Sequence, residues 1–439
     1  MAILVLLQGL NLLPNYVVAK DLLVSDPLPL GEPVEEILVF YEAKTKENFW
    51  SATIQQAHRL KKEIAKLKPG QVQFTLKALS NVHERQWIRR DIERGLEPFI
   101  AKQQHIHLSY SGGTKPISVH SYMMAQTACK TSGATFTASY LDARHHQLYW
   151  DQATTGSHSQ QSIAADHSME LTIKEFLALS GYEMVPGQTG SEGMEDSLQD
   201  LLLTLWKNQR EQYERIQSAV KSLYYLETDY QNNVGAFKDR VEVVKSQLDW
   251  KALEPVVPYL PTLQLIQDGT YSRLLTKAGL SDDEATVKCI AGRWYAGYVR
   301  QQIAQVVEKN NPVAETPWHL SIPDTFGQSL VAKRPGQDNF ELDIYFIVGY
   351  QLIGIAVTTE DSAAVSKSMG FEVIHRTQQI GGDGSVAFLV TLLPDDKRDD
   401  LQKALESDTD IGKRFQVFGQ SDFETIGSKI VDAVYDAQE

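Results

Sequence analysis

The stretch that most constrains how this 439-residue chain can fold is a glycine turn set directly between a strand and a helix. Residues 105–110 alternate in polarity and end in tyrosine, which predicts a strand. Pro116 suits the first turn of the helix that follows. The turn itself reads Ser111-Gly112-Gly113-Thr114-Lys115. Its amide groups, hydroxyls and lysine can hold an anion at the positive end of a helix, although a strand-to-helix turn also favours glycine for conformational reasons alone.

The same order of strand, polar turn and helix recurs through the first 150 residues. Apolar runs predict strands at 3–7, 36–41, 72–76, 105–110, 135–141 and 146–149, with helices at 17–23, 50–67, 84–101 and after Pro116. This alternation is typical of a doubly wound parallel sheet, in which ligands bind beyond the carboxyl ends of the strands. Three turns lie on that edge, and their candidate ligand residues are Gln8, Gly9 and Asn11; Thr45 and Lys46; and Ser111, Gly112, Gly113, Thr114 and Lys115.

Charge is distributed unevenly along the chain. Residues 1–150 carry 17 Lys and Arg against 13 Asp and Glu, a net charge of +4, whereas the rest carries −18. Binding of duplex nucleic acid depends mainly on Lys and Arg at the phosphates. The acidic C-terminal two-thirds therefore makes a poor grip for a long nucleic acid, and the N-terminal domain is the better host for a small polyanion.

The cellular compartment is predicted from motifs that the sequence does not contain. Its two cysteines, Cys129 and Cys289, form neither a disulfide framework nor a zinc motif. The apolar N-terminus has no basic region or cleavage site of a signal peptide, and no apolar run is long enough to cross a bilayer. We therefore expect a cytoplasmic protein with no membrane partner.

Beyond residue 150 the composition changes three times. Residues 152–190 are polar apart from 171–179, and residues 196–247 have a helical period with a break near 232–235. Residues 340–348 and 351–358 predict a hairpin, followed by a helix at 362–369, a run at 371–379 and a strand at 386–392. The predicted layout is a first domain at 1–155, a linker and helical region at 156–284, a second α/β domain at 285–395, and a charged tail at 396–439.

The first domain resembles the CARF domain (CRISPR-associated Rossmann fold) of type III CRISPR systems. The resemblance rests on the first strand ending in Gly-Leu-Asn-x-x-Pro-Asn, on SYSGGTKP, and on the later SYLDA. It implies a homodimer that binds a cyclic oligoadenylate, the second messenger of type III antiviral defence. It also implies that the candidate residues of the three turns hold the phosphates and nucleosides of that ring.

Residues 285–395 resemble the PD-(D/E)xK (restriction-endonuclease-like) nuclease module that ancillary CRISPR effectors fuse to a CARF domain. The segments that carry this likeness are GRWYAGY, FELDIYF and FEVIHRTQQIGGDGSVAFLV. Such nucleases hold a divalent metal with an acidic residue on one strand and Glu-x-Lys on the next. Here Asp343, with Glu341 before it, has the first position, but Ala356 and Thr358 replace the Glu and Lys. We therefore expect a degenerate site with no resident metal, Glu360 being the one nearby substitute.

Three functions follow from these resemblances. The first is a cyclic-oligoadenylate receptor that also opens the ring without a metal, with Lys115 stabilising the developing charge and Ser111 or Thr114 assisting. The second is a ligand-activated, metal-dependent DNA or RNA nuclease that uses Glu341, Asp343 and Glu360. The third is a regulator without enzymatic activity. The sequence leaves the ring size and any nucleic-acid partner open.

Overall fold

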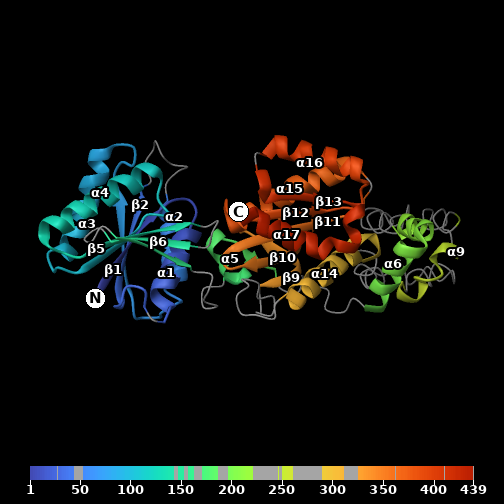
Figure 1. Cartoon of the computed structure of the whole chain (residues 1–439), viewed down its shortest axis with the longest axis horizontal. Helices are drawn as coiled ribbons and strands as arrows, with labels where there is room; N and C mark the ends of the chain where they lie inside the picture. Colours follow the sequence, from blue (N-terminus) through green and yellow to red (C-terminus); the bar gives the residue numbers. More distant parts are fainter. Residues whose placement is uncertain are drawn as a thin grey trace.

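The computed structural model describes residues 1–26, 28–43, 53–142, 147–152, 157–162, 171–185, 196–220, 246, 250–260, 289–310, 325–360, 362–409 and 411–438. Two α/β units and a helical part follow one another along the longest axis of the molecule (Figure 1). The N-terminal unit lies at one end, and helices α6 (Asp196–Asn208) and α9 (Trp250–Leu253) lie at the other. Helix α5 (Ile173–Ser180) stands between the two α/β units.

The N-terminal unit is built on a seven-stranded sheet with the order β3-β2-β1-β4-β5-β6-β7. The first five of these strands are parallel, as the alternating pattern predicts, and the last two pair antiparallel. The polar strand β7 was not predicted, and it extends the sheet beyond residue 155. The strands are β1 (Ala2–Gln8), β2 (Val34–Glu42), β3 (Gln73–Leu79), β4 (His105–Ser109), β5 (Phe136–Asp142), β6 (Gln147–Gln152) and β7 (Ser157–Ser162).

Both faces of this sheet are covered by helices, which explains why β1 is apolar at nearly every position and buried along its length. Leu4 and Leu6 join the core on the side of α1 (Leu13–Val24) and α2 (Ile54–Ile64). Ile3 and Val5 join the core on the side of α3 (Arg85–Ile100) and α4 (Lys115–Ser132). Alternate residues of one strand thus supply two separate cores.

The C-terminal unit has a six-stranded sheet with the order β13-β12-β11-β10-β9-β8. The predicted hairpin is confirmed as β10 (Phe340–Val348) and β11 (Gln351–Val357). Strands β11, β12 (Val386–Val390) and β13 (Phe415–Phe418) are parallel, whereas β8 (Glu183–Met184), β9 (Phe326–Lys333) and β10 are antiparallel. The predicted helix and the following run form one helix, α15 (Ala363–Gly381), on one face of the sheet. Helices α14 (Trp294–Asn310) and α17 (Ile426–Gln438) share the core of the other face.

Residues 396–438 belong to this second unit and do not form a separate tail. Strand β13 pairs with β12, and α17 packs against α14. Helix α16 (Asp395–Thr409) contacts α15 and β13. The carboxylate of Asp422 is 1% exposed, accepts the Gly419 amide hydrogen at 2.7 Å, and pairs with Arg398 and Lys429. The many exposed charges of α16 hid this buried segment from sequence analysis.

The region between the two units connects them. β8 pairs with β9, so a strand from the predicted linker belongs to the second sheet. Residues 210–220 are helical after α6, and the break predicted near 232–235 lies outside the described residues. One core runs from Leu4 and Val17 through Phe176 of α5 to Leu342 and Leu389 in the second sheet. Among the described helices, none combines the length and the apolar character needed to span a membrane.

Candidate functional site

The two best-defined candidate turns meet at the centre of the first sheet. β1 and β4 are neighbours, and the strand order reverses between them, which is where doubly wound sheets form their ligand crevice. The turns after these strands approach so closely that a Cβ atom at Gly9 would lie 2.3 Å from the main-chain oxygen of Gly112. The fold therefore brings Gly9 and Gly112 together and requires glycine at both turns.

The buried residue Asn15, which the sequence analysis used only as part of the motif that carries the resemblance, joins the two turns. The Asn15 side chain donates to the main-chain oxygen of Leu7 at 2.9 Å and to Oε1 of Gln8 at 3.2 Å. The same side chain occupies the space that a Cβ atom at Gly112 would need. Its Oδ1 atom is buried and has no hydrogen-bond partner among the described residues. The available signal was an asparagine next to an apolar segment, because a buried amide there needs hydrogen-bond partners.

Gln8 supports the turn from the inside. Its side chain is 1% exposed, and Nε2 donates to the main-chain oxygen of Gly9 at 2.6 Å. Both ends of the Gln8 amide thus form hydrogen bonds within the protein. Contact between Gln8 and a ligand stays a prediction, and it would require that the amide exchange these hydrogen bonds for bonds to the ligand. Asn11 is exposed, and its Oδ1 accepts the Leu13 amide hydrogen at 3.0 Å at the start of α1.

The glycine turn presents its polar groups outward. Thr114 is the N-cap residue of α4 but makes no side-chain cap hydrogen bond, and both Thr114 and Lys115 are exposed. Ser111 is half-buried, and its Oγ accepts the Leu141 amide hydrogen at 2.7 Å, which fixes the turn to β5. A hydroxyl, a lysine and a helix N-terminus together favour a bound anion. Thr45 and Lys46 of the third candidate turn lie outside the described residues.

Aromatic rings stand beside the glycine turn. Tyr110, the residue before Ser111, stacks on Tyr140 with ring centroids 5.7 Å apart and meets the edge of Tyr122. Tyr140 is 43% exposed. A flat exposed ring next to an anion cradle suits a nucleobase, because stacking tolerates any base. The signal in the sequence was the tyrosine of SYLDA, which was used only for the resemblance.

The degenerate nuclease motif lies on the second sheet. Asp343 of β10 accepts the Val357 amide hydrogen at 2.7 Å, so its carboxylate is tied to the backbone of β11. Burial, joined by the negative charge of Glu341, raises the pKa of Asp343 to about 7. Both oxygens of Glu341 are held by the Arg293 guanidinium, at 2.9 and 3.1 Å. These two carboxylates are thus engaged by protein groups.

The remaining positions of the motif do not complete a metal site. Ala356 and Thr358 are buried and carry no carboxylate, and the Thr358 hydroxyl accepts the amide hydrogen of Glu360 at 3.1 Å. The negative charge of Glu360 contributes to the raised pKa of Tyr213. No cluster of three or more His, Cys, Asp or Glu side chains suited to a metal occurs among the described residues. A divalent cation that prefers several oxygen ligands does not fit this donor set.

The raised pKa of Asp343 predicts a pH dependence of stability. Because the folded protein binds this proton more tightly than the unfolded chain, the contribution of Asp343 is most favourable below pH 4 and is lost as the pH rises toward about 7. The loss should not exceed about 1.4 kcal/mol for each pH unit. Urea unfolding at pH 5 and pH 8 should show a smaller difference for Asp343→Asn than for the wild type. An equal difference in both proteins would contradict the prediction.

The two sheets, the switch-point turns and the hairpin that carries Glu341 and Asp343 form an architecture of two α/β units. Two solved structures share this fold over nearly the whole chain. Can2 from Sulfobacillus thermosulfidooxidans in complex with cyclic tetra-adenylate (cA4) has a TM-score of 0.58 and 14% identity, covering 99% of both chains. Protein VC1899 from Vibrio cholerae has a TM-score of 0.59 and 14% identity, covering 99% of this chain and 98% of that chain. No protein-family model and no curated protein matches the sequence.

Proposed function

We propose that this chain binds a cyclic oligoadenylate at the edge of the first sheet where β1 and β4 end, and serves type III CRISPR defence. The observation that carries the proposal is the contact of the Gly9 and Gly112 turns across the switch point, with exposed Thr114 and Lys115 at the start of α4. Phosphates would lie against the glycine-turn amides and Lys115, and a base against Tyr140. The likeness in fold to a structure that holds cyclic tetra-adenylate supports the same ligand class here.

The ligand is expected to lie between two copies of the chain. A ring of repeated nucleotides has rotational symmetry, which an isologous dimer can match with two identical turns. Helix α4, which begins at the glycine turn, exposes Val119 by 54% and Met123 by 44% one turn apart. Exposed apolar side chains on the helix nearest to the ligand suit a homodimer contact.

The site supports a metal-free opening of the ring. The ribose 2′-hydroxyl loses its proton to water as its oxygen attacks the adjacent phosphorus, the bond from phosphorus to the 5′-oxygen breaks, and the 5′-oxygen takes up a proton from water, so that no net proton is released. The products are a 2′,3′-cyclic phosphate and a 5′-hydroxyl. Lys115 would stabilise the extra negative charge on the phosphoryl oxygens, with Ser111 or Thr114 donating a hydrogen bond, once the turn fixes the in-line geometry.

The C-terminal unit is the alternative seat of activity, as a ligand-activated, metal-dependent nuclease using Glu341, Asp343 and Glu360. The ion pair of Glu341 with Arg293 and the replacement of the Glu-x-Lys pair by Ala356 and Thr358 speak against it. We propose that this unit has no resident divalent metal and does not cleave nucleic acid. A chain that binds the ring and cleaves neither ring nor nucleic acid would be a regulator.

The first test is incubation of the protein in EDTA with cyclic tri-, tetra- and hexa-adenylate, followed by chromatography. We expect linear products ending in a 2′,3′-cyclic phosphate. Lys115→Ala should lower the rate at least a hundredfold, a loss of about 2.7 kcal/mol of transition-state stabilisation. Lys130→Ala, at the exposed far end of the same helix, is the matched control and should leave the rate unchanged.

Other outcomes separate the alternatives. A ring that binds and is recovered intact leaves a receptor without ring-opening activity, and failure of all three rings to bind contradicts the proposed function. The incubation is repeated with Mg²⁺ or Mn²⁺ and with plasmid DNA or RNA. Cleavage that requires the metal and is lost in Asp343→Asn would establish the nuclease.

A further inference from the structure

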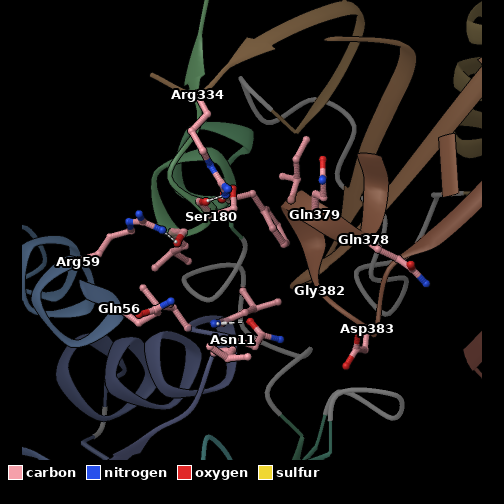
Figure 2. Close-up of a pocket in the computed structure, with 15 residues that line it drawn as sticks. Asn11, Gln56, Arg59, Ser180, Arg334, Gln378, Gln379, Gly382 and Asp383 are labelled. Carbon is pink, nitrogen blue, oxygen red and sulfur yellow. Dashed lines mark hydrogen bonds between the residues drawn. The ribbon is translucent and has the colours of Figure 1, made fainter. Parts of the chain in front are cut away.

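A cavity of about 400 Å³ lies between the two α/β units, away from the glycine turn. Its walls come from the turn after β1, from α2, from the end of α5, from the residue after β9, and from the end of α15. Figure 2 shows Arg59 and Arg334 reaching from different elements toward Ser180, with Asn11 and Gln56 below them and Gln379 on the opposite side. None of residues 111–115 lines it. Cavities of this size at domain interfaces are common sites for small molecules.

The two arginines bring positive charge to one wall of this cavity. Arg59 donates to the main-chain oxygen of Leu179 at 3.3 Å, and Arg334 donates to that of Ser180 at 2.6 Å. Within the described part of the chain, neither guanidinium forms a salt bridge with a carboxylate. Burial and the neighbouring charge of Arg334 lower the pKa of Arg59. The negative charge of Glu63 acts on Arg59 in the opposite direction, and both arginines stay protonated, so two positive charges lie close together at this wall, while Asp383 lines the cavity just after α15.

Other groups in the cavity also have unused bonding capacity. Oε1 of Gln56 and Nε of Arg334 are buried without a hydrogen-bond partner among the described residues. Such atoms cost free energy unless a water or a ligand satisfies them. Phe176, Leu179 and Ile380 supply buried apolar surface beside these polar groups. The ligand that fits has an anionic group for the arginines and a flat, partly apolar group with polar edges for the remaining wall.

We propose that the cavity binds a nucleoside phosphate, with the phosphate between Arg59 and Arg334 and the base against the apolar wall. Guanidinium groups suit phosphate because their paired N–H donors match its oxygens. The amides of Asn11, Gln56 and Gln379 lie where they can bond the edges of a base. The proposal rests on the cavity, which shares Asn11 with the candidate ligand residues of the turn after β1, and it holds whether or not the glycine turn binds a cyclic oligoadenylate. A ligand there contacts both units at once and steadies their relative placement.

Titration calorimetry with AMP, adenosine and inorganic phosphate tests this site on the full chain. AMP should bind, and adenosine should bind at least tenfold more weakly because it lacks the phosphate. Arg59→Gln and Arg334→Gln should each weaken AMP binding at least tenfold, whereas Lys61→Ala, an exposed position of α2 outside the cavity lining, should leave it unchanged. Absence of AMP binding, binding unaffected by both arginine changes, or binding lost in Lys61→Ala would overturn the proposal.

A measurement on the wild type avoids variants that fail to fold, since the Arg59 guanidinium packs against Gly181. Photo-crosslinking with 8-azido-AMP, followed by peptide mapping, should place the adduct on α2, α5, α15 or the residues next to Arg334. Unlabelled AMP in excess should prevent it. Adducts confined to residues 111–115, or labelling that AMP does not compete away, would show that the cavity is not the site.

Discussion

Gly9→Ala should lower the affinity for the proposed ligand, a cyclic oligoadenylate, at least a hundredfold, a loss of about 2.7 kcal/mol of binding free energy. The added Cβ atom would meet the main-chain oxygen of Gly112, which cannot swing aside as the end of a flexible side chain could. The two turns must therefore separate, and the amides that would hold the phosphates lose their relative placement. Titration calorimetry with the ring that binds the wild type measures the change.

Gly70→Ala is the matched control for this substitution. Gly70 has a φ of +71° and open space where a Cβ atom would stand. Alanine there should cost roughly 1 kcal/mol of folding stability through backbone strain and leave ligand affinity unchanged. Circular dichroism of both variants separates a local change at the turn from a loss of fold. Wild-type affinity in a folded Gly9→Ala protein would show that the contact of the two turns does not shape the site.

Removing residues 396–439 should abolish the cooperative unfolding of the C-terminal unit. The deletion takes away the edge strand β13, the helix α16, and the helix α17 with its buried Ile426, Ile430 and Val434. Each large aliphatic side chain left without its partners costs about 2–5 kcal/mol, and domains have only about 5–15 kcal/mol of stability in total. Differential scanning calorimetry of the full and shortened chains measures the effect.

A milder substitution distinguishes the buried network from the deletion as a whole. Asp422→Ala removes the carboxylate that Arg398 and Lys429 share and leaves the Gly419 amide without its acceptor, and it should cost about 1–3 kcal/mol. Asp399, which pairs with the same Arg398 but is 56% exposed, provides the control. Asp399→Ala should cost less than about 1 kcal/mol.

A shortened chain that unfolds like the full chain would mean that residues 396–439 are a dispensable tail.

The sequence pattern predicted the elements that burial makes apolar in composition. Apolar runs indicated the parallel strands of the first sheet and the hairpin of the second, because a strand covered on both faces is apolar throughout. The strand β7 reads SHSQQS, so it contains no apolar run from which a strand could be predicted. We predicted a helix at 362–369 and a separate run at 371–379, but Gly370 between them lies within α15, where Leu405 of α16 occupies the space of its missing side chain. Tertiary contact there outweighs the low helix propensity of glycine.

The candidate sites differ in how many of their residues can be predicted from the sequence. The glycine turn is contiguous, so its residues could be named together. Asn15 acts on Gly112 from another element, and the role of Gln8 inside the turn depends on a side-chain orientation that sequence does not give. The cavity between the units is assembled from residues that include Asn11, Arg59 and Arg334. These residues lie far apart in the sequence. Only the packing of the two units makes them neighbours.

Helix α5 has a consequence for how such proteins diversify. It packs against α2 on one side and α15 on the other, and Glu175 bonds to Tyr16 and Lys20 of the first unit. Its apolar side chains complete a core that neither unit closes alone. Joining the first unit to a different C-terminal unit would leave the side of α5 that contacts α15 exposed to water. An exchange of units that keeps this core intact must therefore carry α5 together with the surfaces on both of its sides.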